Sequence, residues 1–175
     1  TMNPSTQDLA DAASKPAAET IYILPNNKNI ILAAEQVNDI IDKNVVVIPS
    51  KTVPQGIAAL INFAYDKTPE ENAELMTTEM KKVKTGQVTY AVRDTHIDDK
   101  TICSGDIMGV GDHAILAVGK EIDAVAEETV AEMVDEDSEL ISIYYGEDMN
   151  EEEAEALRER FEELYPDCDV EVNFG

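Results

Sequence analysis

Two related corners decide the fold of this chain: Ile23-Leu24-Pro25-Asn26-Asn27-Lys28-Asn29-Ile30 and Val47-Ile48-Pro49-Ser50-Lys51-Thr52. Each corner follows an apolar, largely β-branched run that is typical of a strand. Each leads into apolar residues at spacings of three and four, which indicate a helix. Two successive strand–helix units with short links predict a parallel sheet with right-handed crossovers. In such a sheet the carboxyl ends of neighbouring strands lie side by side, so we expect the two corners to meet.

The rest of the chain continues as alternating helices and strands. The sequence predicts an α/β fold with a parallel βαβ subdomain over residues 1–85 and a second α/β subdomain with a β-hairpin over residues 86–175. Thr52 and Gln55 have the spacing of a capping box, and Asn3 and Asn150 are placed to cap helices. The expected helices begin at Asn3, at Asn29, at Thr52 (through Ile57, Leu60, Ile61 and Ala64), at 70, at 121 and at Asn150. The expected strands cover 20–24, 45–48, 88–92, 106–110, 114–118, 140–145 and 170–174.

Acidic residues outnumber basic ones and gather in the second half of the chain. The 175 residues include 37 Asp and Glu against 13 Lys and Arg, a formal charge of −24, yet 43% of them are hydrophobic and can supply a core. Residues 1–100 hold 14 acidic and 10 basic side chains, whereas residues 101–175 hold 23 and 3. Such a surface repels nucleic acid and anionic membranes. It suits a basic protein partner, and it equally suits a role in solubility alone.

Cysteine and histidine spacing gives no sign of a metal site. The two cysteines, Cys103 and Cys168, form no Cys-x-x-Cys motif, and neither histidine has a ligand spacing with them. No apolar run reaches the length of a membrane span, and nothing resembles a signal peptide, so we expect a cytoplasmic protein without membrane insertion. The opening Thr1-Met2 suggests a piece cut from a longer protein.

The two corners supply most of the candidate binding residues. Open α/β sheets bind ligands outside the carboxyl ends of their strands, and helix starts with nearby lysines can hold a phosphate or carboxylate. The alternative is purely structural, because asparagine readily adopts left-handed turns and caps helices. The candidate residues for a ligand or a partner are Asn26, Asn27, Lys28, Asn29, Ser50, Lys51 and Thr52.

Arg93 and Asp94 complete the candidate set. They follow a predicted strand and could act as an acid–base pair, or they could form a local ion pair in a solvated loop near the expected turn Ile97-Asp98-Asp99-Lys100. The glycines of the second half fall in hairpin positions and make no nucleotide-binding loop. We therefore assign no catalytic residue and no metal ligand to this chain.

Five motifs, in the same order, give nearly the whole chain a resemblance to one family. It resembles the C-terminal part of the bacterial dihydroxyacetone-kinase-like protein that serves as the ATP-binding subunit of fatty acid kinase. The motifs are Thr1-Met2-Asn3-Pro4-Ser5-Thr6, Ile23 to Gln36, Val47 to Gly56, Thr85-Gly86-Gln87-Val88-Thr89-Tyr90-Ala91-Val92-Arg93-Asp94-Thr95 and Tyr145-Gly146-Glu147-Asp148.

The resemblance implies a recruiting role rather than catalysis by this piece. In that family an N-terminal kinase domain of the same chain holds ATP and magnesium, so we expect no cofactor here. The C-terminal region recruits a fatty-acid-binding protein of the DegV type, whose bound fatty acid is phosphorylated to an acyl phosphate for phospholipid synthesis. The fold implied is a DegV-like arrangement of two subdomains. Two other roles stay open: binding of a small anion or acyl phosphate at the lysine corners, and homodimerisation of the parent kinase.

Overall fold

The chain folds into two compact units of similar size. The computed structural model describes residues 3–97 and 100–175. Unit 1 comprises Thr1–Thr85 and unit 2 comprises Gly86–Gly175. The charge divides between them unevenly, because unit 1 holds 11 acidic and 8 basic residues whereas unit 2 holds 26 and 5.

Unit 1 is built on a two-stranded parallel sheet. Its strands β1 (Thr20–Ile23) and β2 (Asn44–Val47) pair in parallel, with Thr20 opposite Asn44 and Ile23 opposite Val47. The predicted parallel βαβ unit is thereby confirmed. The elements of unit 1 that surround the strands are α1 (Thr6–Ser14), α2 (Ile31–Glu35), the 3₁₀ helix η1 (Gln36–Asp39), α3 (Val53–Ile61) and α4 (Pro69–Met80).

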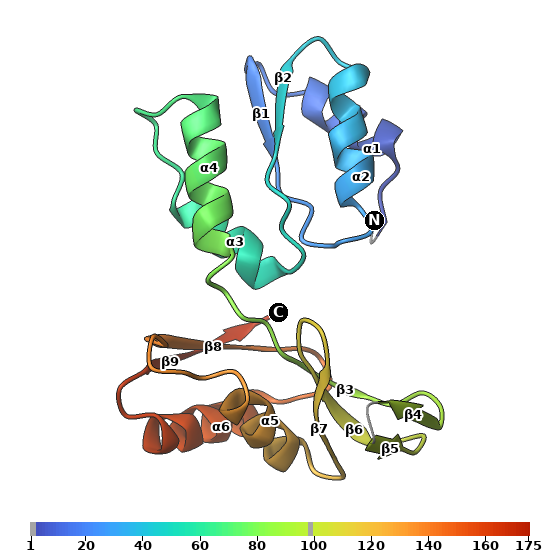
Figure 1. Cartoon of the computed structure of the whole chain (residues 1–175), viewed down its shortest axis with the longest axis vertical. Helices are drawn as coiled ribbons and strands as arrows, with labels where there is room; N and C mark the ends of the chain where they lie inside the picture. The colour runs from blue at the N-terminus through green and yellow to red at the C-terminus, as the bar shows by residue number, and fades with distance from the viewer. Residues whose placement is uncertain (1–2, 98–99) are drawn as a thin grey trace. The chain divides into compact units, whose positions relative to one another are not determined.

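Helices cover both faces of this sheet. Successive side chains of a strand point to opposite faces, and the two strands supply one core each way. One core joins Val45 to Ala10, Ala13 and Val37, and so lies under α1, α2 and η1. The other, under α3 and α4, joins Ile48, Ala59, Met76 and Met80. Figure 1 shows α1 and α2 on one side of the strands and α3 and α4 on the other.

Three local expectations for unit 1 are corrected. The cap of α1 is Ser5, in a reciprocal capping box with Asp8, and not Asn3. The helix expected from Asn29 begins at Ile31, has no side-chain cap and passes into η1 after one turn. The capping box expected between Thr52 and Gln55 is only half formed. Thr52 Oγ1 accepts from the Gln55 N–H at 3.4 Å, but Gln55 Oε1 accepts from Lys51 at 2.9 Å, one residue earlier than expected.

Unit 2 combines antiparallel and parallel pairing. Its strands β3 (Gln87–Tyr90), β6 (Ile107–Val110) and β7 (Ile115–Gly119) form an antiparallel sheet in the order β3-β6-β7, which contains the predicted hairpin. The strands β8 (Leu140–Tyr145) and β9 (Asp169–Phe174) pair in parallel through α6 (Glu151–Leu164), and α5 (Ile122–Ala131) follows β7. Two further short strands, β4 (Thr95–Ile97) and β5 (Lys100–Ile102), were not expected from the sequence.

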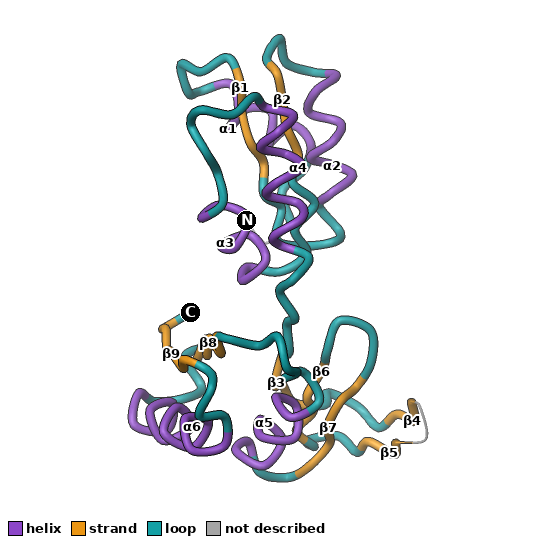
Figure 2. The backbone as a smooth tube through the Cα atoms, turned by 60° about the vertical axis from the view of Figure 1, so that its left-hand side comes forward, coloured by secondary structure: helices purple, strands orange, loops and turns teal. Residues whose placement is uncertain are grey.

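The helices of unit 2 pack on both of its sheets. Val125 of α5 joins Ile107 and Ala117 of the antiparallel sheet, while Ala126 joins Leu157 and Phe161 of α6 beside the inner side chains of β8 and β9. Figures 1 and 2 both show α5 and α6 side by side in this unit. The expected cap of α6 is confirmed, since Asn150 and Glu153 form a full capping box.

Asp106 ties the end of β3 to the start of β6. Its side chain is buried, forms an ion pair with Lys120, and accepts a hydrogen bond from the Cys103 N–H at 2.9 Å. The hydrogen bond from Lys120, with that from Cys103 second, holds the pKa of Asp106 below its ordinary value. Gly105, with φ of 89°, makes the turn between them.

This carboxylate gives unit 2 an acid-sensitive joint. Because the folded pKa of Asp106 is lowered, the stability it adds is present above the pKa of an unfolded aspartate, about 3.9, and is lost as the pH falls through the folded value. We expect Asp106→Asn to flatten the acid limb of unit 2 stability, measured by hydrogen exchange between pH 5 and pH 2. Asp112→Asn, at the exposed hairpin turn, serves as the control. Equal acid limbs for the wild type and Asp106→Asn would contradict the assignment.

Candidate interaction site

The two corners meet at the carboxyl edge of the unit 1 sheet. Ser50 is fully buried, and its Oγ accepts from the Asn26 N–H at 3.1 Å and donates to Asn26 Oδ1 at 2.7 Å. Asn26 has a φ of 53°, in the left-handed region that asparagine tolerates. The hydrogen-bonded pair Asn26–Ser50 therefore locks one corner onto the other.

Helix α3 lies against this pair through a glycine. A Cβ placed on Gly56 would lie 2.0 Å from Asn26 Oδ1 and 2.7 Å from Asn26 Cγ, so the absence of a side chain is what allows the close approach. Ala59, one turn further, is fully buried among Ile48 and Met76. The buried face of α3 is thus made of small residues.

The N–H groups at the start of α3 are largely occupied. Gln55 N–H is bound by Thr52 Oγ1, Lys51 N–H is bound by Gln55 Oε1, and Pro54 has no N–H to offer. Thr52 Oγ1 also lies 2.9 Å from Thr85 Oγ1. An anion at this corner would therefore rely on lysine side chains more than on helix N–H groups.

The remaining corner residues face water or serve the turn. Asn27 Oδ1 accepts from the Asn29 N–H at 2.9 Å, which makes an Asx-turn. Lys28, Asn29 and Lys51 are exposed. Of the predicted corner set, the structure brings Asn26, Ser50 and Thr52 into the packed junction and leaves both lysines at its surface.

Arg93 and Asp94 lie in unit 2, apart from the corner residues in the chain and in a different unit. Asp94 Oδ1 accepts from the Ser104 N–H at 2.6 Å, and both residues are exposed. The ion pairs found among the described residues do not include Arg93 with Asp94. Asp98 and Asp99, the centre of the expected turn beside them, lie outside the described residues.

The outer face of α3 carries a stripe of large apolar side chains, which the sequence did not lead us to expect. The exposed fractions are 53% for Val53, 38% for Ile57, 62% for Leu60, 77% for Ile61 and 97% for Tyr65. Their spacing of four, three, one and four places them on one side of a helix and of the residues that follow it. We call these five residues the α3 stripe. The signal in the sequence was the pair of small residues, Gly56 and Ala59, on the opposite side.

A buried asparagine holds the far end of the stripe in place. Asn72, 1% exposed on α4, accepts from the Ala64 N–H at 2.9 Å and donates to the Ala64 carbonyl at 2.8 Å and the Lys67 carbonyl at 3.4 Å. The ring of Phe63 lies edge-on to the ring of Tyr65, with centroids 5.1 Å apart. The loop that ends the stripe is therefore fixed by side chains.

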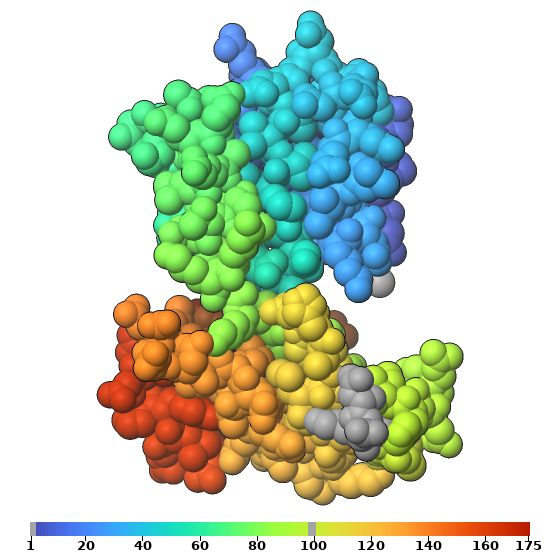
Figure 3. Space-filling view, viewed as in Figure 1, coloured from blue at the N-terminus to red at the C-terminus, as the bar shows by residue number. Residues whose placement is uncertain are grey.

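The acidic excess of unit 2 is concentrated on α5 and α6. Helix α6 carries seven glutamates and two arginines, and the arginines are already paired within the unit. Arg158 contacts Glu155 and Glu162, while Arg160 contacts Glu127 of α5 at 3.0 Å. The α6 side chains reach the surface, as the red region of the space-filling view shows (Figure 3). What faces water is thus an excess of carboxylates.

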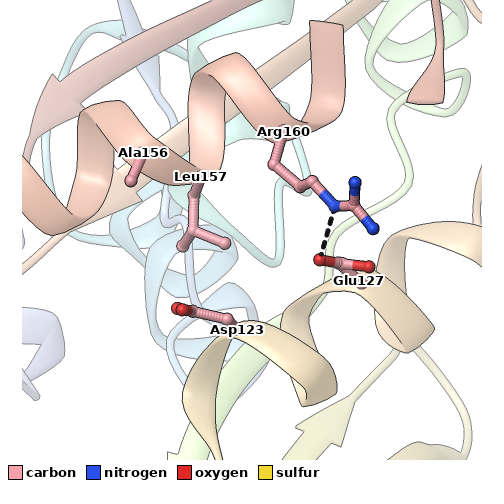
Figure 4. A pocket seen from close by; sticks show the side chains of 5 residues that line it. All are labelled: Asp123, Glu127, Ala156, Leu157 and Arg160. Atoms are coloured by element: carbon pink, nitrogen blue, oxygen red, sulfur yellow. Dashed lines mark hydrogen bonds and ion pairs between the residues drawn. The ribbon is translucent and has the colours of Figure 1, made fainter. Parts of the chain in front are cut away.

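A small hollow of about 210 Å³ lies between α5 and α6. It is lined by Asp123 and Glu127 from α5 and by Ala156, Leu157 and Arg160 from α6. Figure 4 shows Leu157 pointing toward α5 and Arg160 reaching across to Glu127. The hollow is smaller than the roughly 300–1,000 Å³ typical of small-molecule sites. It therefore belongs to the acidic surface rather than forming a separate ligand pocket.

Across residues 3–97 and 100–175, no group of three or more His, Cys, Asp or Glu side chains is placed to hold a metal ion. None of the helices in the same part of the chain has the length and apolar character needed to cross a membrane.

The fold and these two surfaces define a two-unit α/β module with an apolar helix face and an acidic helix face. Residues 1–175 match the FakA-like C-terminal family of fatty acid kinase, and the chain belongs to this family. It is 46% identical over its whole length to Protein YloV of Bacillus subtilis (strain 168). It is 41% identical to an uncharacterized protein of Staphylococcus aureus (strain USA300), again over its whole length. The chain spans 32% of the length of each of these relatives.

Proposed function

We propose that this chain is the recruiting module of a fatty acid kinase, and that its acidic unit binds a fatty-acid-binding protein of the DegV type. Membership of the FakA-like C-terminal family of fatty acid kinase supports this proposal. The observation that carries it is the charge partition, since unit 2 holds 26 acidic against 5 basic residues. Complementary charge steers association and selects partners, so the docking surface of the binding protein should be basic.

Phosphoryl transfer is assigned to a different part of the kinase. The bound fatty acid would be phosphorylated on its carboxylate by an ATP- and magnesium-binding domain, with this module holding the binding protein within reach. The effective concentration gained by such tethering raises the rate without a catalytic residue in the module itself.

The proposal is tested by titrating a DegV-type fatty-acid-binding protein, loaded with fatty acid, into this chain. We expect binding at low salt that weakens as salt is raised from 50 to 500 mM, because exposed charges are screened. The triple variant Glu152→Lys, Glu159→Lys and Glu163→Lys, on one side of α6, should weaken binding at least about tenfold, or about 1.4 kcal/mol. Isothermal titration calorimetry measures both effects.

A matched control carries the same change of net charge on unit 1. Glu35→Lys, Asp39→Lys and Glu74→Lys replace three exposed acids there and should leave affinity within about twofold. If the two triple variants lose affinity equally, the effect is one of net charge and the α6 assignment fails. If neither the wild type nor the control binds at low salt, recruitment by this module fails altogether.

Anion binding at the lysine corners is the second candidate, and the locked Asn26–Ser50 junction favours it because it brings the corners of Lys28 and Lys51 together. Lys28→Ala with Lys51→Ala should abolish binding of an acyl phosphate or inorganic phosphate to this chain. The same pair should leave binding of the fatty-acid-binding protein unchanged if that protein docks on unit 2.

A further inference from the structure

The α3 stripe is apolar in a position where a solvent-facing helix is normally polar. The outward face of a surface helix usually carries charged and polar residues, but no residue of α3, Val53–Ile61, is charged. Its members contribute little to the core of unit 1, which is supplied by Ile48, Ala59, Met76 and Met80. A contiguous exposed apolar patch of this kind marks an interaction surface.

The charge of the stripe limits what can cover it. The partner proposed above is basic and needs acidic residues to recognise, and α3 offers none. A charged surface placed on the stripe would lose water without gaining a counter-charge. The fitting occupant is therefore another uncharged apolar surface, and among the described residues the α3 stripe is itself such a surface.

We propose that two copies of this chain associate through the α3 stripe, with the two α3 helices antiparallel about a two-fold axis near Ala58. An isologous contact requires a self-complementary patch, and a uniform apolar stripe is self-complementary. The pairing meets little electrostatic opposition, because α3 is uncharged and the unit that carries it holds 11 acidic against 8 basic residues. This inference goes beyond the recruiting function and does not depend on it.

The antiparallel arrangement follows from what flanks the stripe. Lys51 precedes α3, and Asp66 with Lys67 follow Tyr65. In a parallel pair, Lys51 would face the same lysine of the second copy, with no acid of the flank beside it. In an antiparallel pair, each Lys51 faces the end that contains Asp66. Val53 of one copy then lies near Tyr65 of the other, with Ile57 and Ile61 at the centre.

The stripe is short, so the dimer should be weak. A standard stable interface involves roughly 20–30 residues on each side, many more than the five residues of the stripe. We expect sedimentation equilibrium of the whole 175-residue chain to show a monomer–dimer equilibrium with a Kd on the order of 10–100 μM, a range set by the small interface. Since the contact contains no ion pair at its centre, 500 mM salt should not weaken it. This salt response is opposite to that expected for the basic partner.

The decisive variant is Leu60→Lys with Ile61→Lys, which places two exposed charges at the contact without touching the core. It should be monomeric, with a Kd raised at least tenfold. Val92→Lys with Leu140→Lys makes the same chemical change at two exposed positions of unit 2 and should dimerise as the wild type does. Circular dichroism checks that both variants remain folded.

Cysteine crosslinking tests the orientation. In chains with Cys103 and Cys168 replaced by serine, a mixture of Val53→Cys and Tyr65→Cys chains should form the mixed disulfide faster than either chain crosslinks to itself. A monomeric wild type at 500 μM, or a dimer indifferent to Leu60→Lys with Ile61→Lys, overturns the proposal. Faster self-crosslinking of Val53→Cys overturns the antiparallel arrangement. A monomer whose Leu60→Lys and Ile61→Lys variant loses the fatty-acid-binding protein assigns the stripe to that protein instead.

Discussion

Gly56→Ala is expected to destabilise unit 1 by about 2 kcal/mol, although alanine is ordinarily the better residue in a helix. In an unobstructed helix the change would stabilise by roughly 0.5–1 kcal/mol. Here the new Cβ would lie 2.0 Å from Asn26 Oδ1. Asn26 cannot swing aside without giving up its hydrogen bond from the fully buried Ser50. Overpacking of this kind costs roughly 1–3 kcal/mol.

The measurement must report on unit 1 alone, because the chain has two units and a single unfolding transition cannot be assumed. Native-state hydrogen exchange followed by mass spectrometry resolves peptides of residues 3–85 from those of unit 2. Gly146→Ala is the control, since no heavy atom lies within 4 Å of a Cβ there, and it should change stability by less than about 0.5 kcal/mol.

A second substitution can relieve the first. Asn26→Gly removes the obstructing side chain and suits the φ of 53° at that position. The double variant Asn26→Gly with Gly56→Ala should therefore be less destabilised than the two single effects added together. A stabilising Gly56→Ala would show that the two corners are not locked as described.

Asn72→Ala is expected to cost unit 1 roughly 3 kcal/mol. The change removes three hydrogen bonds and leaves the N–H and carbonyl of Ala64 without a protein partner. A buried polar group left unsatisfied costs about 1–3 kcal/mol, and the half-buried position of Ala64 places each group toward the lower end. The small cavity left by the truncated side chain adds to the loss.

The loop that Asn72 holds should respond more than the rest of the unit. We expect amides of residues 62–68 to exchange at least tenfold faster in Asn72→Ala than in the wild type. Asn62→Ala is the matched control, because Asn62 makes a single side-chain bond to Ala58 of its own helix. Equal losses in the two variants would mean that Asn72 does not clamp the loop.

The meeting of the two corners was predictable from the sequence because it follows from connectivity. Once two strands pair in parallel through a short helical link, their carboxyl ends must lie at one edge. The sequence also identified the capping box of α6, where Asn150 and Glu153 satisfy each other's backbone within four residues. Both inferences rest on local chemistry or on topology, which the order of residues determines.

The α3 stripe could not be predicted because periodicity does not say which face of a helix is buried. The spacing of Ile57, Leu60 and Ile61 indicates an apolar face, and such a face usually packs inward. In unit 1 the inward face is instead the one with Gly56 and Ala59, since Asn26 leaves no room for a larger side chain. That constraint comes from a residue 30 positions away, which no local pattern contains.

Unit 2 shows a different limit of sequence reading. The strands β4 and β5 have only three residues each, and β4 includes His96, so no alternation of apolar residues distinguishes them from a loop. Their pairing is instead apparent from the register, in which Thr95 lies opposite Ile102. Short polar strands of this kind acquire their structure from the partner strand.

Every strand pair in the described chain joins segments that are close in sequence. The registers place Thr20 opposite Asn44, Gln87 opposite Val110 and Leu140 opposite Asp169, separations of at most 29 residues. Pairing over such short loops has a low entropic cost and is typical of rapid folding. Each unit can therefore complete its sheets during synthesis, soon after its own last strand leaves the ribosome, without waiting for a distant segment.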